Sequence, residues 1–374
     1  MELHLAPFQS FRCNGCGRCC RNSWSVEVEP VALSEIAASV ATQSKERQGY
    51  QPLVVLSAGQ TVTGRDSSGA CLYLDSVGLC ELHAELGAEK KPLACQLYPY
   101  SVTSTPDGRF ASLSFACPVA LWGSDENLEV NRSDLQSLLQ RRGATGGPLP
   151  ETVEIVRGRA VPWSSYLQLE AALSQRLQAD LPARSSLGAV GSVLSILAAT
   201  PGDTVPDWSS LTADAPDEEF EEQLLEMVCA SLIALLELPD QPELRQEFSQ
   251  ALQAGAPLVS PRHRYPLPAL SFGARPDALL ETCFERYLAN FLFGKALLCG
   301  TVVSRLLGLA AGTALIVYYS QAFESNDATR REAISRAFEL VEAELLTHSR
   351  STDPLFASLE ETFCTAYGLS MEAP

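Results

Sequence analysis

Apolar residues recur at helical spacing from Trp163 onward. Leu169, Leu173 and Leu177, for example, lie four residues apart and share one helix face. The segments SLGAVGSVLSILAA and DEEFEEQLLEMVCASLIALLEL also have helical patterns. We predict that three further helices close this region: Asp277–Leu298, Val302–Phe323 and Thr329–His348. The longest apolar run, Leu306–Tyr319, is shorter than the roughly 20 residues of a membrane span, so we predict that it forms a buried core helix.

The first third of the chain has short strand patterns instead. Trp24, Val26 and Val28 alternate with polar residues, which favours a strand, and Pro30 then opens a helix to about Val40. Further short strands or hairpins are predicted in PLVVLSAGQTVTGRD, CLYLDSVGLCELH and GRFASLSFACP, the second with its turn near residues 76–78. Because strands this short bury little surface, a bound metal would supply much of their stability.

These patterns predict an α+β chain in which a small, irregular, metal-bound cysteine-cluster domain precedes a mainly α-helical domain. With 374 residues, the chain is long enough for two domains. The Gly- and Pro-rich stretch RRGATGGPLP indicates a linker between them. We place the cysteine-cluster metal-binding domain at residues 1–122, the linker region at 123–160 and the α-helical domain at 161–374.

The composition limits the partners and the compartment. With 45 acidic and 27 basic residues, the net charge of −18 argues against nucleic acid or an anionic membrane surface as the partner, whereas basic partners such as protein lysines fit. The N-terminal residues show neither a basic segment nor an apolar run of signal-peptide length, which predicts a cytoplasmic protein. In that reducing compartment, twelve cysteines favour metal binding or redox chemistry over disulfides.

The cysteines of the first third have the spacing of a metal site. The stretch CNGCGRCC is a C-x2-C-x2-C-C pattern, and Gly15 and Gly17 let its backbone fold around an ion or cluster. Four thiols could hold one zinc or one [4Fe-4S] cluster, and eight could hold two centres or one centre and a redox pair. The spacing alone does not choose the metal. The predicted metal-site residues are Cys13, Cys16, Cys19, Cys20, Cys71, Cys80, Cys95 and Cys117.

Other cysteines and one histidine have simpler interpretations. His83 lies three residues after Cys80 and is either a further ligand or an ordinary surface or hydrogen-bonded histidine, since the thiols already suffice. The remaining cysteines are isolated on helical segments, where we expect ordinary buried side chains. They are Cys229, Cys283, Cys299 and Cys364.

The cysteine arrangement resembles the YkgJ-type CxxCxxCC family, which is described as zinc- or iron-chelating. The resemblance rests on FRCNGCGRCC, on CLYLD with GLCELH, and on KPLACQLYPY. Within that family, the helical extension resembles flagellin lysine-N-methylase through ERYLANFLFGKALLCG. This resemblance implies an iron–sulfur-dependent methyltransferase that moves a methyl group from S-adenosylmethionine to exposed lysines of a protein substrate such as flagellin.

The residues themselves leave this activity open. No strand followed by a G-x-G loop is present, and the radical-SAM spacing C-x3-C-x2-C is absent from CNGCGRCC. Candidate bases for deprotonating a lysine are Asp75, Glu81, His83, Tyr98 and Tyr100, but none stands out by spacing, and a solvated or hydrogen-bonding side chain is the better explanation of each. The alternatives are a non-catalytic zinc or iron–sulfur module with a partner-binding helical domain, and a redox or metal sensor using Cys19 and Cys20.

One cation falls on the apolar face of the predicted helix 277–298. Lys295 follows Phe291 by four residues, and Asn290 lies beside it. Such a cation needs a partner or a route to water. Either its ammonium reaches water near the helix end, or Lys295 and Asn290 face an inter-domain cleft where Lys295 holds the carboxylate of S-adenosylmethionine or a cluster-bound anion. The apolar face is formed by Leu280, Phe284, Tyr287, Phe291 and Leu298.

Overall fold

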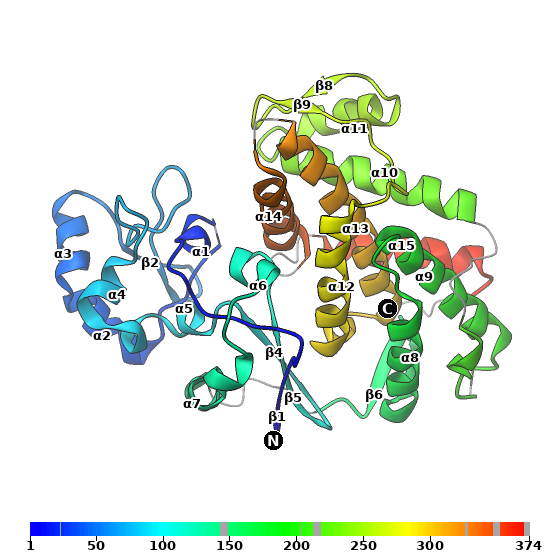
Figure 1. Cartoon of the computed structure of the whole chain (residues 1–374), viewed down its shortest axis with the longest axis horizontal. Coiled ribbons are helices and arrows are strands. Elements are labelled where there is room, and N and C mark those ends of the chain that lie inside the picture. The colour runs from blue at the N-terminus through cyan, green and yellow to red at the C-terminus, as the bar shows by residue number, and fades with distance from the viewer. Residues whose placement is uncertain are drawn as a thin grey trace. The chain divides into compact units, whose positions relative to one another are not determined.

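The chain forms two compact units, which are described separately. The computed structural model describes residues 1–22, 24–142, 149–202, 204–211, 218–325, 328–346 and 352–369. Unit 1 comprises Met1–Val102 and Ala111–Gly147, and unit 2 comprises Thr103–Phe110 and Pro148–Pro374. The fold mixes helices with small sheets, and helices predominate (Figure 1).

Unit 1 is built from short elements. One core cluster of this unit contains Val28, Ile36, Ala41, Tyr73 and Leu82. Its helices are α1 (Arg18–Arg21), α2 (Pro30–Ala38), α3 (Val40–Arg47), α4 (Glu81–Leu86), α5 (Leu93–Leu97), α6 (Pro118–Trp122) and α7 (Arg132–Arg142). Its hairpin pairs β2 (Leu53–Val55) with β3 (Thr61–Thr63).

The predicted elements of unit 1 are partly confirmed. The helix opened by Pro30 is present and ends at Ala38, because the Ser39 side chain accepts a hydrogen bond from the Thr42 amide and starts α3. The predicted strand around Val26 is wrong, since this stretch makes a single bridge, Glu27 to Val62. A three-stranded sheet has the order β1-β5-β4, and its strands are β1 (Leu3–Leu5), β4 (Tyr100–Thr105) and β5 (Gly108–Leu113).

Much of the region predicted as a linker, residues 123–160, has regular structure. A 3-10 turn at Leu128–Asn131 leads into α7, which buries Leu135 and Leu139 on one face. Strands β6 (Thr152–Val156) and β7 (Arg159–Pro162) pair antiparallel. Two leucines four residues apart are enough to pack one face of a helix against the core, although they predict a helix only weakly from the sequence. Residues 143–148 of the Gly- and Pro-rich stretch lie outside the described residues.

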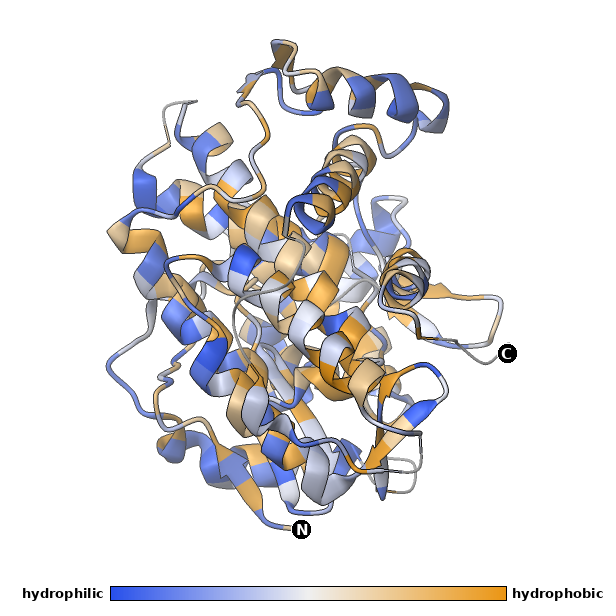
Figure 2. Ribbon diagram, turned by 90° about the vertical axis from the view of Figure 1, so that its right-hand side faces the viewer, coloured by the Kyte–Doolittle hydropathy of each residue, from blue (hydrophilic) through white to orange (hydrophobic). Residues whose placement is uncertain are grey.

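Unit 2 is a helical assembly around α13. Its helices are α8 (Trp163–Arg176), α9 (Pro182–Ala199), α10 (Glu218–Glu237), α11 (Arg245–Gln253), α12 (Ala278–Phe293), α13 (Val302–Glu324), α14 (Arg330–Val341) and α15 (Asp353–Ala366). A two-residue pairing joins β8 (Leu258–Val259) to β9 (Pro266–Leu267). Helix α13 packs against α9, α14 and α15. Apolar residues concentrate on the inner helices, as Figure 2 shows.

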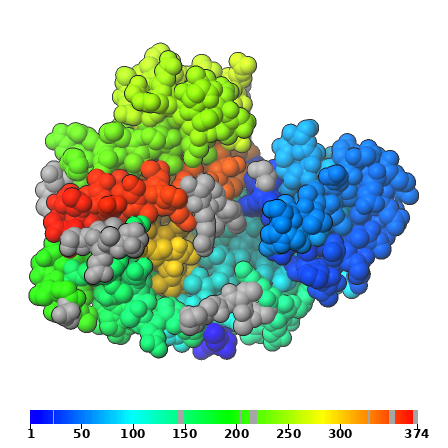
Figure 3. All heavy atoms as spheres, turned by 180° about the vertical axis from the view of Figure 1, so that it is seen from behind, coloured from blue at the N-terminus to red at the C-terminus, as the bar shows by residue number. Residues whose placement is uncertain are grey.

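Helix α13 confirms the predicted buried core helix. Among the described residues, it is the one helix long and apolar enough to cross a membrane, but 89% of its apolar window is buried inside the protein. Helices α11 and α15 were not predicted from the sequence pattern. Helix α15, the red band in Figure 3, buries Phe356, Leu359 and Phe363.

Two predicted helices end earlier than expected. Helix α12 stops at Phe293, because Gly294 caps it and Lys295 adopts the left-handed conformation with φ of 58°. A 3-10 turn, Ala296–Cys299, then follows. Helix α14 ends at Val341 and continues as a π-helical turn, Glu342–Leu346. The last two residues of that prediction, 347 and 348, lie outside the described residues.

Candidate metal centre

The cysteine loop of residues 13–20 is folded tightly against a neighbouring turn. Gly15 and Gly17 have positive φ values of 70° and 68°. A Cβ added at Gly17 would lie 2.4 Å from the carbonyl oxygen of Gly78. The turn that contains Gly78 is shaped by Asp75, whose carboxylate accepts hydrogen bonds from the amides of residues 77 and 79. The two glycines therefore bring the cysteine loop beside the turn that leads into Cys80.

This contact predicts a specific sensitivity at Gly17. We expect Gly17→Ala to destabilise unit 1 by roughly 2–4 kcal/mol, the sum of a left-handed backbone cost and overpacking. Gly59→Ala is the matched control, since Gly59 has φ of 80° and nothing lies within 4 Å of an added Cβ. Urea denaturation and metal content of both variants test this. Equal losses of stability in the two variants would show that the left-handed backbone conformation, and not the contact with Gly78, causes the destabilisation.

Four cysteines from separate elements form an inner thiol group, Cys20, Cys71, Cys80 and Cys95. Cys20 lies on α1, Cys71 in a bridge with Arg65, Cys80 just before α4 and Cys95 on α5. The Cys71 amide donates to the Cys20 carbonyl at 2.7 Å, which joins the first two backbones. Cys71 and Cys80 both pack against the core cluster of unit 1.

The charges of these thiols affect one another's pKa values. Burial raises the pKa of Cys95 to about 12, and the negative charges of Cys20, Cys71 and Cys80 add to the rise. The pKa values of Cys71 and Cys80 are also raised, first by burial and then by Cys20. The pKa of Cys20 is raised chiefly by a hydrogen bond with Cys19 and by burial.

A second, outer thiol group contains Cys13, Cys16 and Cys117. Cys117 is buried at the start of α6, whereas Cys13 and Cys16 are exposed. Burial raises the pKa of Cys117 to about 11, with contributions from the charges of Cys16 and Cys13. Both predicted uses of the eight cysteines, one centre or two, are compatible with this division.

The donor chemistry of the inner thiol group fits zinc or an iron–sulfur cluster. Arg65 and Lys91 are half-buried cations whose charges lower the pKa of inner thiols, so they offset the negative charge of a thiolate set. Within the described residues, no three His, Cys, Asp or Glu side chains converge as a completed metal site. The inner thiols are thus neighbours that do not form a complete ligand set in this structure.

The pattern of the sequence does not predict a role for these two cations. Lys91 lies in the motif KPLACQLYPY and Arg65 in the stretch TVTGRD, so both lie close to predicted metal-site cysteines along the chain. The number of closely spaced thiols does indicate that cations lie near them, because a cluster of thiolates needs nearby positive charge. Nothing in the spacing of the basic residues, however, indicates which of them turn toward the sulfurs.

The candidate bases have structural contacts in unit 1. Asp75 shapes the turn described above, and Glu81 pairs with Lys45 at 3.1 Å. Tyr98 packs on Trp24, with ring centroids 5.3 Å apart. Tyr100 packs on the ring of Phe11, and burial raises its pKa to about 12. The structure exposes His83 on α4, as the interpretation of an ordinary surface histidine predicts.

Lys295 and Asn290 lie in unit 2, both of them buried. Lys295 is 6% exposed, its ammonium pairs with Glu170, and it lies 4.6 Å from the centroid of the Phe110 ring. The prediction that its ammonium reaches water near the helix end is therefore wrong, because Glu170 supplies a countercharge inside the unit. A role in holding S-adenosylmethionine stays a prediction.

The isolated cysteines divide three to one. Cys229, Cys283 and Cys364 are buried, as predicted. Cys299 is exposed, which contradicts the prediction. The reason is the early end of α12, which puts Cys299 at the end of a 3-10 turn instead of inside a helix.

Comparison with known proteins finds one similarity. Residues 12–118 match the family model CxxCxxCC, described as "Putative zinc- or iron-chelating domain". No curated protein and no solved structure matches the chain. The matched residues include the seven cysteines of the inner and outer groups and also Cys19, and they stop before the helices of unit 2. The match indicates zinc or iron chelation in this part of the chain and leaves the resemblance to a flagellin methylase as a proposal.

Proposed function

We propose that unit 1 binds zinc or an iron–sulfur cluster through the inner thiol group. The observation that carries this proposal is that the backbones of Cys20 and Cys71 are hydrogen-bonded and that Cys71 and Cys80 pack against one core cluster. Arg65 donates to the Cys20 carbonyl, and the charges of Cys20, Cys71 and Cys80 raise the pKa of Cys95. Either metal would cross-link the four elements, and an iron–sulfur cluster would add redox chemistry. The outer thiol group is the candidate for a second centre.

A more specific proposal is that the protein is a methyltransferase. We propose that the chain transfers a methyl group from S-adenosylmethionine to lysines of a protein substrate, flagellin-like in type, in the cytoplasm and without nucleic acid or membrane. The proposal is supported by the resemblance of the cysteine motifs to the CxxCxxCC family and of ERYLANFLFGKALLCG to flagellin lysine-N-methylase. The chain's net charge of −18 also suits a basic substrate. The alternative is a metal-binding module without catalysis, whose helical unit binds a partner.

Lys295 is the residue we propose for the cofactor. Its ammonium has three N–H donors, and a carboxylate of S-adenosylmethionine would take one that Glu170 leaves. Asn290 would assist from the preceding turn of α12. Unchanged affinity for S-adenosylmethionine in a folded Lys295→Met variant would remove both residues from the proposal.

Metal and sulfide analysis tests these functions first. After anaerobic purification, we expect about four iron and four acid-labile sulfide atoms per chain with a visible absorption band if a [4Fe-4S] cluster is bound. Binding of S-adenosylmethionine would then be measured on the iron-loaded protein. Zinc without sulfide or colour would contradict the iron–sulfur methyltransferase and favour the metal-binding module, and protein without either metal would contradict both.

A further inference from the structure

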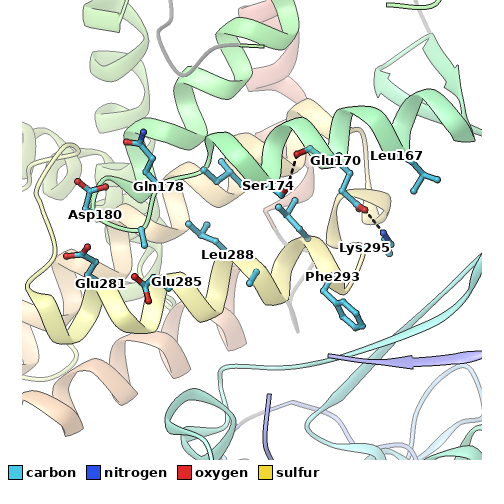
Figure 4. Close-up of a pocket in the computed structure, with 15 residues that line it drawn as sticks. Leu167, Glu170, Ser174, Gln178, Asp180, Glu281, Glu285, Leu288, Phe293 and Lys295 are labelled. Carbon is cyan, nitrogen blue, oxygen red and sulfur yellow. Dashed lines mark hydrogen bonds and ion pairs between the residues drawn. The ribbon is translucent and has the colours of Figure 1, made fainter. Parts of the chain in front are cut away.

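An open groove runs between α8 and α12 in unit 2. Its volume is about 730 Å³, and its middle is lined by aliphatic side chains such as Leu177, Leu288 and Leu292. Charged groups stand at its two ends (Figure 4). Glu170 and Lys295 lie at one end, and Asp180, Glu281 and Glu285 gather at the other.

The Glu170 end is already neutralised. One oxygen of Glu170 accepts from Lys295, and the other accepts from the hydroxyl of Tyr166 at 2.7 Å. The side chains of Glu170 and Lys295 are 13% and 8% exposed, so this pair is shielded from solvent. The net charge of the groove therefore comes from its opposite end.

The opposite end has an excess of negative charge. Asp180 contacts Arg275 at 3.2 Å, but the Arg275 side chain is 67% exposed, so solvent screens this pair. Within the part of the chain that the structure describes, Glu281 and Glu285 make no ion pair. They lie four residues apart on α12, where like charges repel. A cation between them would relieve this repulsion.

We propose that the groove binds a primary alkylammonium group carried on an aliphatic chain. The ammonium lies against Glu281 and Glu285, and the methylenes pack along Leu288 and Leu292. Two sources have this chemistry, a free polyamine and a lysine side chain of a protein. All groups of the proposed site lie in unit 2, so its binding can be measured apart from the metal centre, whereas Lys295, which the proposed function assigns to S-adenosylmethionine, lines the other end of the same groove.

Calorimetric titration of the metal-loaded, full-length protein tests this proposal. The probes are spermidine, a capped lysine tripeptide and its acetyl-lysine counterpart, at low and physiological salt. We expect saturable binding of at least one amine probe and none of the neutral acetyl-lysine probe. Binding of spermidine alone identifies a polyamine, and binding of the lysine peptide identifies a protein lysine. Absence of saturable binding by both amines would overturn the proposal.

Variants locate the binding in the groove. Glu281→Gln with Glu285→Gln should weaken binding about tenfold or more, since both anionic partners are lost. Ala289→Phe should also weaken it, because Ala289 is exposed and lines the groove, so the larger side chain fills it without changing the charge. The matched control, Glu243→Gln with Glu247→Gln, removes two exposed carboxylates near α11. An equal loss in this control would show a nonspecific effect of net charge and overturn the site.

Discussion

Chelation of the metal is expected to unfold unit 1 and to leave unit 2 folded. The apolar core of unit 1 includes a cluster of five buried residues, Val28, Ile36, Ala41, Tyr73 and Leu82, surrounded by short helices and strands. Structural zinc supplies on the order of 10 kcal/mol or more of folding free energy in small domains, so its loss should unfold the short elements that pack around this cluster. Unit 2, by contrast, has its own core around α13, whose apolar window is 89% buried.

Hydrogen exchange before and after chelation measures this result for each unit. We expect amides of α2, α3 and α4 to lose protection together, and amides of α13 to keep it. Cys71→Ser and Cys95→Ser should give the same loss without a chelator. Cys299→Ser is the control, because this thiol is exposed and lies in unit 2. Protection of α2 to α4 that survives chelation would contradict a structural role for the metal.

The sequence predicts the long helices well because their signals are local. The all-apolar stretch that became α13 and the leucine repeat of α8 each depend on spacing within one segment. The eight cysteines are also visible in the sequence, and their match over residues 12–118 supports chelation. In contrast, the division into inner and outer thiol groups depends on which loops meet, such as the approach of Gly17 to Gly78. The spacing of residues along the chain does not predict which loops come into contact.

The surroundings of Lys295 show the same limit. Its place on an apolar stripe is visible in the sequence, but its partner, Glu170, lies 125 residues away. The helix was predicted to continue through Lys295, whereas Gly294 ends it and the lysine adopts a left-handed backbone. A lysine at a position that favours glycine is costly unless its side chain is held, and here Glu170 and Phe110 hold it.

Lys295→Met is therefore expected to destabilise unit 2 by about 3–5 kcal/mol. The substitution keeps the left-handed backbone residue but leaves the Glu170 carboxylate buried without its cation, which is the costly way to break a buried pair. Tyr166 would remain as the hydrogen-bond donor to Glu170. Chemical denaturation, followed by a probe in unit 2, measures the loss.

A second substitution separates the broken pair from lost packing. Adding Glu170→Leu to Lys295→Met removes the unpaired carboxylate, so much of the lost stability should return, although the Tyr166 hydroxyl then loses its acceptor. The control is Glu222→Gln, which breaks the exposed Arg184–Glu222 pair and should cost at most about 1 kcal/mol. If Lys295→Met costs no more than Glu222→Gln, then Glu170 does not depend on Lys295, and the ammonium is free to serve a ligand. Recovery in the double variant together with loss of S-adenosylmethionine binding would instead assign Lys295 both roles.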